Sequence, residues 1–388
     1  MIARILVGLA YVGLCAFQAQ AADNIPLGQR QKICLNGVWD FAAAGTSATE
    51  IPTDGWGELR VPSSWVGYGP VNFSVSSADA AANHAWFRRT FFVPKDWSDG
   101  RRVKLLFLDL DWAHKVFVNG DLVDEYPAMR LCFEVDITSH VKFGEDNVLT
   151  VWTAKSGDDD MEGGIVRSVY LTSVPAVHVE YSHALPSVKD MTLTVKTRVK
   201  NEDAVARTVT VQPAVRDNGT TVIELPQVSA TVEPGSSVEV QTTAPWKDPV
   251  LWGFGPYGRP YLYHLSTRID GDAVADQTFD RFGFREFRTE GAKFLFNGKE
   301  YFVKGDLISR AWPVTEDPSF VAAWYQTFRS ANINFQRLHG HHGKCFESHY
   351  WYQVGDELGH LVEAQLNLTR PAQDDPEHLK LWTTYVNY

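Results

Sequence analysis

Residues 294–306 read FLFNGKEYFVKGD, and this stretch opens the part of the chain that decides the fold. It is strand-like and starts with an Asn297-Gly298 hairpin turn. Two further apolar strands are predicted after it: Ile333–Leu338 (INFQRL) and His360–Ala364 (HLVEA). Helix signals lie between and after these strands, at Asp317-Pro318, at Gly359 and at Asp375-Pro376. Strands that alternate with helices predict a parallel sheet or a barrel.

Two β modules are predicted before this region. From Asn24 to about Pro175, short β-branched runs are separated by turns, which is typical of a sandwich or barrel. From Ala176 to Phe287 a second module follows, with the size of an immunoglobulin-like sandwich. Its stretch Thr192–Lys200 alternates, and one face carries Leu193, Val195 and Val199. Two triplets are predicted hairpin turns: Asp217-Asn218-Gly219 and Glu233-Pro234-Gly235.

The bulk composition narrows the function. At 388 residues the chain should hold two or three domains. Its net charge of −11 argues against a nucleic-acid partner. The aromatic fraction of 13%, with 13 Trp, serves either β-sandwich cores or stacking against sugar faces, and core packing is the preferred interpretation.

The N-terminus resembles a secretory signal peptide. Arg4 precedes the apolar run Ile5–Phe17, and Ala19-Gln20-Ala21 is a small-x-small cleavage site. The run is too short to span a bilayer, so an exported protein that is periplasmic or secreted, with no membrane partner, is predicted. Loss of Cys15 would leave an odd number of cysteines, which favours buried free thiols over a disulfide framework: Cys34, Cys132 and Cys345.

Several short segments, taken in order, resemble one known family. The first module contains CLNGVWD (34–40), VPSSW (61–65), FRRTFFV (87–93), VFVNG (116–120), FEVDIT (133–138) and GGIVRSVYL (163–171). Later segments are Trp252–Leu265, FLFNGKEYFVKG (294–305), Asn332–Leu338 and DELG (356–359). Together they are similar to glycoside hydrolase family 2. The resemblance implies a sugar-binding jelly roll, an immunoglobulin-like domain and the entry into a catalytic (β/α)8 barrel.

The resemblance also implies a chemistry. Members of the family are exo-acting, retaining β-glycosidases, and a β-galactosidase-like enzyme is expected here. Their double displacement needs two carboxyl groups about 5–5.5 Å apart, one as nucleophile and one as acid/base. In the family both are glutamates on later barrel strands, and the acid/base belongs to an Asn-Glu pair. The only Asn-Glu pair here, Asn201-Glu202, lies in the second module. Neither catalytic glutamate is therefore expected in these 388 residues, and the chain is predicted to be inactive alone.

Four residues are candidates for the substrate site. Asp158 matches the family's jelly-roll loop that contacts the terminal sugar, and a solvated acidic loop is the alternative. Arg337 and His339 fall at the carboxyl end of the second barrel strand, where barrel active sites lie. Arg337 matches an arginine that keeps the nucleophile ionised in the family. Asp306 is predicted to end the first barrel strand and either face substrate or cap a turn.

Some residues carry weaker predictions. Arg167 is expected to pack the jelly roll against the barrel, Glu363 to be a supporting acid, and Trp312 to stack on a sugar or cover a core edge. Four histidines fit no strong metal motif, so no metal or cofactor is predicted: His339, His341, His342 and His349. The family's β-galactosidases usually carry a histidine three residues after the arginine. Gly340 stands there, which leaves the choice of sugar open.

The predicted organisation is a signal peptide over residues 1–21, a jelly roll over 22–175, an immunoglobulin-like sandwich over 176–288 and an incomplete (β/α)8 barrel over 289–388. The predicted partner is a carbohydrate with a terminal β-linked sugar, and homo-oligomerisation is left open. The alternative interpretation is a non-catalytic protein whose β-sandwiches bind carbohydrate or act as a scaffold.

Overall fold

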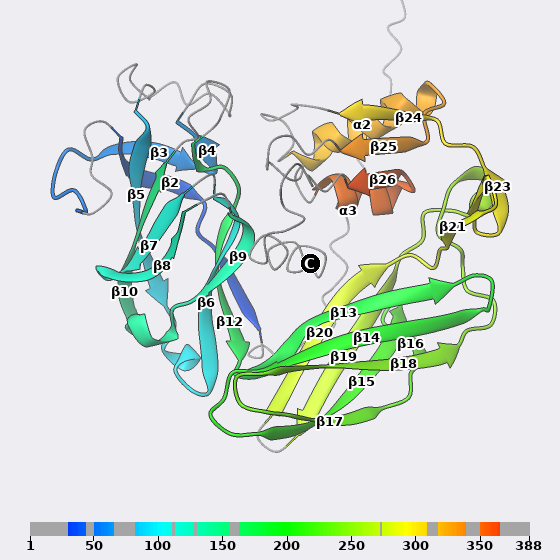
Figure 1. The fold of residues 1–388 in the computed structure, drawn as a ribbon, viewed down its shortest axis with the longest axis horizontal. Coiled ribbons are helices and arrows are strands. Elements are labelled where there is room, and N and C mark those ends of the chain that lie inside the picture. The colour runs from blue at the N-terminus through cyan, green and yellow to red at the C-terminus, as the bar shows by residue number, and fades with distance from the viewer. Residues whose placement is uncertain are drawn as a thin grey trace, which may run out of the picture.

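The computed structural model describes residues 30–43, 50–65, 82–110, 113–127, 130–154, 163–271, 274–308, 317–338 and 350–364. Two antiparallel β-sandwiches and a smaller unit of strands and helices follow one another along the chain (Figure 1). The second sandwich lies at the bottom of this view, and the other two units stand on either side above it. The predicted multidomain β-sandwich architecture is therefore present.

The first sandwich contains most of the aromatic core. Its elements are β1 (Gln31–Cys34), β2 (Gly37–Ala42), β3 (Gly57–Val61), β4 (Ser63–Ser64), β5 (His84–Val93), the short 3-10 helix η1 (Lys95–Trp97), β6 (Arg101–Leu110), β7 (His114–Val118), β8 (Asp121–Tyr126), β9 (Arg130–Asp136), the 3-10 helix η2 (Thr138–His140), β10 (Glu145–Ala154), β11 (Gly164–Ile165) and β12 (Val169–Pro175). A sheet in the order β3-β2-β5-β10-β7-β8 packs on one in the order β1-β12-β6-β9. Trp39, Phe87 and Trp97 are fully buried, which confirms the preference for core aromatics.

The second sandwich is built from long alternating strands. Its elements are β13 (Val177–Ser187), β14 (Thr192–Asn201), β15 (Arg207–Asp217), β16 (Thr220–Glu224), β17 (Val228–Val232), β18 (Ser237–Pro245), the 3-10 helix η3 (Gly255–Tyr257), β19 (Tyr263–Gly271) and β20 (Val274–Phe282). Leu193, Val195 and Val199 are all 0% exposed, as the alternation predicts. The two sheets have the orders β13-β14-β18 and β16-β15-β19-β20, and β17 pairs with β15.

The third unit begins with a hairpin sheet and continues with parallel strands. Its elements are β21 (Phe287–Glu290), β22 (Lys293–Phe296), β23 (Lys299–Tyr301), β24 (Gly305–Ile308), α2 (Pro318–Ser330), β25 (Phe335–Leu338), α3 (Tyr350–Leu358) and β26 (Leu361–Ala364). The strands β24, β25 and β26 form a parallel sheet, and α2 and α3 pack on one of its faces (Figure 1). Asp317 caps α2 by accepting a hydrogen bond from Ser319 N at 2.8 Å, as predicted. Neither helix in the described part of the chain has the length and apolar character of a membrane span.

Several sequence predictions are wrong in detail. The predicted hairpin turn at Asn297-Gly298 is present between β22 and β23, but the rest of residues 294–306 does not form one strand, because the chain breaks again before β24. The Asn297 side chain fixes this turn by donating to Trp252 O at 2.9 Å and Tyr257 O at 2.7 Å. The triplet Glu233-Pro234-Gly235 is a turn but not a hairpin, since β17 and β18 belong to different sheets. Cys34 is a free thiol, but it is exposed rather than buried.

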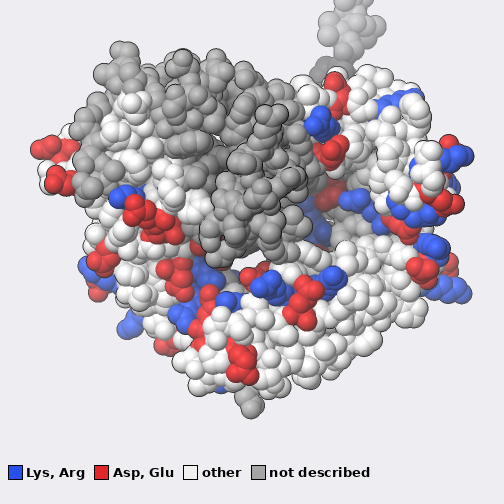
Figure 2. All heavy atoms as spheres, viewed as in Figure 1, with Lys and Arg blue, Asp and Glu red and all other residues white. Residues whose placement is uncertain are grey.

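Ion pairs and backbone hydrogen bonds hold the two sandwiches together. The Arg30 guanidinium contacts both carboxylate oxygens of Asp276 on β20, at 2.8 and 2.6 Å, and donates to Val179 O on β13. The same carboxylate accepts a hydrogen bond from Val179 N at 2.8 Å. Lys104 of the first sandwich pairs with Glu202 of the second at 3.1 Å. On the face shown in Figure 2, basic and acidic side chains are interspersed among the described residues.

Trp252 joins the second sandwich to the third unit. Its ring is 1% exposed, and its Nε1 donates to Asp356 O at the end of α3 at 2.6 Å. The Arg285 guanidinium lies over the ring, 5.0 Å from its centroid. Arg281 forms an ion pair with Glu357 at 2.6 Å in the same junction. The helices of the third unit are therefore held by the chain segment that leaves the second sandwich.

Candidate active site at the parallel sheet

Two predicted residues meet on one face of the parallel sheet. Arg337 on β25 is the register partner of Glu363 on β26 and of Leu307 on β24. Partners in neighbouring strands lie about 4.8 Å apart and direct their side chains to the same face. This face is opposite to the one covered by α2 and α3, which Leu338 and Val362 contact. The arrangement places Arg337 and Glu363 on adjacent strands near their carboxyl ends, the end that carries the active site in (β/α)8 barrels.

Gln336 fixes the position of Arg337 from the other face. Its side chain is fully buried under α2. Its Oε1 accepts a hydrogen bond from Trp324 Nε1 at 3.1 Å, and its Nε2 donates to Asp306 O at 3.0 Å. Because a buried amide must satisfy its polar atoms, these bonds lock β24, β25 and α2 together. Gln336 was not among the predicted site residues, although a glutamine inside an otherwise apolar strand is a recognisable signal.

Asp306 does not have the position that was predicted for it. It is the second residue of β24 rather than its last, because the strand starts only at Gly305. Its register partner is Gln336, so its side chain belongs to the face opposite Arg337. Its Oδ1 accepts a hydrogen bond from Leu307 N at 2.7 Å. Asp306 and Arg337 therefore do not meet on one face.

The other candidate residues have different outcomes. Asp158, His339 and Trp312 lie outside the described residues, as do the signal peptide and the helix predicted at Asp375-Pro376. Arg167 is buried within the first sandwich, with its Nε 3.5 Å from Asp109 Oδ2 on β6. Within the described ranges, no three His, Cys, Asp or Glu residues gather in a way that would hold a metal ion.

Burial changes the ionisation of groups under the sheet. It raises the pKa of the Asp356 carboxyl, which the nearby Arg285 and Arg281 charges oppose. It lowers the pKa of His360, the residue before β26, to about 4, and the Arg329 charge adds to this shift. His360 is therefore neutral at pH 7, stacked on Tyr325 with ring centroids 4.3 Å apart. These groups support the base of the sheet, away from the carboxyl ends of its strands.

Sequence comparison places the two sandwiches in a known family. Residues 33–175 match the model of "Glycosyl hydrolases family 2, sugar binding domain", and residues 172–285 match "Glycosyl hydrolases family 2". The chain belongs to glycoside hydrolase family 2. The resemblance seen in the sequence segments is thereby confirmed.

Curated relatives of this family 2 chain are glycoside hydrolases. A β-glucuronidase of Formosa agariphila is 25% identical over 75% of this chain, and a β-galactosidase of Bacteroides ovatus is 25% identical over 71%. These matches cover 32% and 34% of the relatives' own lengths. The family 2 chain thus spans about a third of the curated relatives that it matches.

Solved structures show the same fold. A β-glucuronidase of Bacteroides uniformis superposes with a TM-score of 0.72 at 22% identity, over 91% of this chain and 44% of that one. A structure described as a putative β-galactosidase of Bacteroides fragilis gives a TM-score of 0.70 over 86% of this chain and 53% of that one. These two structures therefore share the fold described here.

Proposed function

We propose that this chain is part of an exported, exo-acting β-glycosidase that works with retention of configuration. It contains the sugar-recognising sandwiches and the first strands and helices of the catalytic barrel. The observation that carries the proposal is the Arg337–Glu363 pair, displayed on one face of a parallel sheet that follows two family 2 sandwiches. The relatives that support it act as β-glucuronidases and β-galactosidases, so the substrate class is a terminal β-linked sugar.

The role of Arg337 follows from its chemistry. A guanidinium stays charged at every working pH and binds carboxylates through two parallel hydrogen bonds. On the face of β25 opposite the helices it stabilises the ionised form of a carboxylate nucleophile, which is the form that attacks an anomeric carbon. Glu363 lies next to Arg337 and acts as a supporting acid that orients it.

The catalytic pair itself is assigned to other residues. Among the described strands of the parallel sheet, Glu363 is the one carboxylate on the same face as Arg337. A retaining mechanism needs two carboxyl groups about 5–5.5 Å apart, so these strands alone do not complete it. The 388-residue chain is accordingly expected to give no turnover of nitrophenyl β-glycosides.

Gene sequence and enzymology together test the proposal. The DNA downstream of codon 388 should encode an Asn-Glu strand and a second glutamate, and a stop codon at position 389 would refute the enzyme assignment. The product of the whole reading frame should hydrolyse a nitrophenyl β-glucuronide or β-galactoside, and proton NMR should show the β-anomer first. First release of the α-anomer would refute the retaining mechanism. N-terminal sequencing of the exported protein should begin after Ala21.

A further inference from the structure

A cavity of about 340 Å³ lies between the second sandwich and the base of the parallel sheet. Its wall combines η3 and its flanking residues with the end of α2 and the turn between α3 and β26: Phe254, Pro256, Tyr257, Arg329, Asn332 and His360, with Ile333, Asn334 and Gly359. It opens at the amino ends of β25 and β26, whereas Arg337 and Glu363 lie further along the same strands. Its size and its position between two structural units are those of a small-molecule site.

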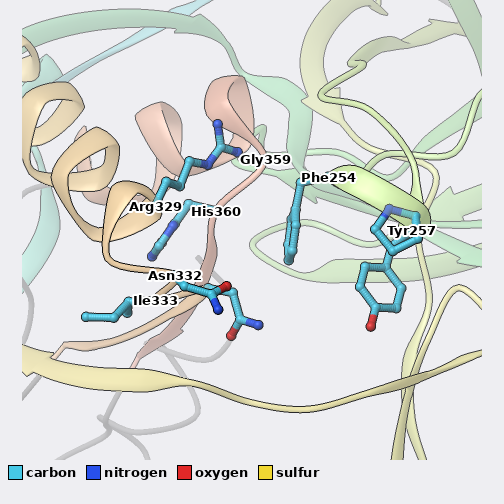
Figure 3. A pocket seen from close by; sticks show the side chains of 9 residues that line it. Phe254, Tyr257, Arg329, Asn332, Ile333, Gly359 and His360 are labelled. Carbon is cyan, nitrogen blue, oxygen red and sulfur yellow. The ribbon is translucent and has the colours of Figure 1, made fainter.

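One wall of the cavity is aromatic and rigid. Phe254 is held in a ring cluster with Phe296 and Tyr301, at centroid distances of 5.9 and 6.1 Å. In Figure 3 its ring turns a flat face toward the opposite wall. The Tyr257 hydroxyl is already engaged, because it donates to Glu300 O at 3.0 Å. This wall therefore offers a stacking surface of the kind that receives the flat face of a six-membered ring.

The opposite wall is polar and positively charged. Arg329 donates one hydrogen bond to Leu358 O, and within the described ranges no carboxylate lies within ion-pair distance of it. Burial lowers the pKa of Arg329. The Asn332 side chain also lines the cavity, on the same side as His360 (Figure 3). The guanidinium still has donors to give, and their geometry matches a carboxylate.

His360 adds an unmet hydrogen bond to this wall. It is 3% exposed, and its Nε2 is buried without a hydrogen-bond partner in the described part of the chain. Buried polar atoms of this kind are rare in native proteins. At pH 7 His360 is neutral, so it offers this wall an unpaired ring nitrogen rather than a charge. The positive charge among the residues that line the cavity comes from Arg329.

We propose that this cavity is a binding site for a small molecule consisting of a single ring that carries a carboxylate. The ring stacks on Phe254, the carboxylate pairs with Arg329, and a ring substituent bonds to Asn332. Because the ligand contacts both the second sandwich and the helices of the third unit, its binding stabilises the junction between them. The proposal does not depend on the hydrolytic function.

Calorimetric titration of the full chain at pH 7 tests the site with four probes. Glucuronate and benzoate each carry a ring and a carboxylate, and the two distinguish a sugar acid from an aromatic acid. Methyl β-glucoside has only the ring, and inorganic phosphate has only the charge. We expect at least one ring carboxylate to bind and to raise the melting temperature. Its affinity should be at least about tenfold higher than that of the glucoside or phosphate. Equal or tighter binding of phosphate, or no binding of either acid at millimolar concentrations, would overturn the proposal.

Matched variants locate the binding. Arg329→Gln should weaken the binding of the ring carboxylates by about tenfold or more. Phe254→Ala should also weaken the binding of both glucuronate and benzoate. The control is Arg281→Gln, which removes an ion pair with Glu357 from the same junction but does not line the cavity. Unchanged affinity in Arg329→Gln, or an equal loss in Arg281→Gln, would contradict the assignment. If Arg329→Gln does not fold, the wild-type titration and Phe254→Ala decide the question.

Discussion

The Arg30–Asp276 contact allows a quantitative test of how the two sandwiches are joined. The Asp276 carboxylate is fully buried, while the Arg30 side chain is 31% exposed. The pair has two guanidinium–carboxylate contacts. The same carboxylate accepts a hydrogen bond from the backbone amide of Val179 on the edge strand β13. Replacing Arg30 by Ala leaves the buried charge without its main partner.

The size of the effect follows from burial. Removing one partner of a fully buried pair costs about 3–5 kcal/mol, but exposed pairs are worth about 0–1 kcal/mol. Because a third of Arg30 faces solvent, a loss of about 2 kcal/mol is expected, which is roughly a thirtyfold change in an opening equilibrium. Hydrogen exchange at the Val179 amide reports this opening, since that amide donates to the carboxylate itself.

The assay is hydrogen exchange with mass spectrometry on peptides from β13. Arg30→Ala should speed exchange at Val179 by roughly thirtyfold. The control is Arg198→Ala, because Arg198 pairs with Glu180 on the same strand at 2.9 Å while both side chains are more than a third exposed. That variant should change exchange by less than about fivefold. Similar small effects in both variants would show that the buried carboxylate is not what protects the edge of β13.

Three further predictions concern the third unit. Between about pH 4 and 6.5, His360 binds a proton in the unfolded chain but not in the folded one. The free energy of unfolding should therefore fall by up to about 3 kcal/mol as the pH drops through this window. In urea titrations, His360→Gln should flatten this pH dependence. Gly359 has a φ of +72°, and a Cβ added there would lie 2.6 Å from Gly253 O. Gly291 has a similar φ of +59° but open space around it, so Gly359→Ala should lower the melting temperature clearly more than Gly291→Ala. Equal shifts would contradict the clash. Asp317→Ala should destabilise α2 by about 1 kcal/mol and Asp317→Asn by much less, and circular dichroism during thermal unfolding should separate them.

Local patterns in the sequence predicted the elements whose cause is local. The alternation around Leu193 and Val195 places a buried face correctly because a strand has a period of two. The Asp317-Pro318 pair predicts the start of α2 because capping and a fixed proline φ act within one turn. The order of the two sandwiches was implied by the resemblance of short segments to family 2, and the family models match both of them.

The errors arose where distant contacts decide. The hairpin turn at Asn297-Gly298 was predicted and is present between β22 and β23, but the second break in the predicted strand, after Tyr301, was not. The position of Asp306 within β24 changed as a result. The cavity between the second sandwich and the parallel sheet was not predicted either, because Phe254 and His360 come together only when the third unit packs on the second sandwich. Residue types alone contain no signal for such a meeting.

The position of Trp252 has a practical consequence for dividing the protein. The second family match ends at residue 285, which makes that point a natural place to cut out the sandwich for separate expression. Trp252 lies inside that fragment, but its indole is covered by Phe296 and bonded to Asp356, and both lie beyond the cut. A fragment ending there would expose part of the tryptophan ring to solvent and would lose the hydrogen bond to Asp356 O. An autonomous unit should therefore retain the segment through Ala364, or replace Trp252 by a polar residue.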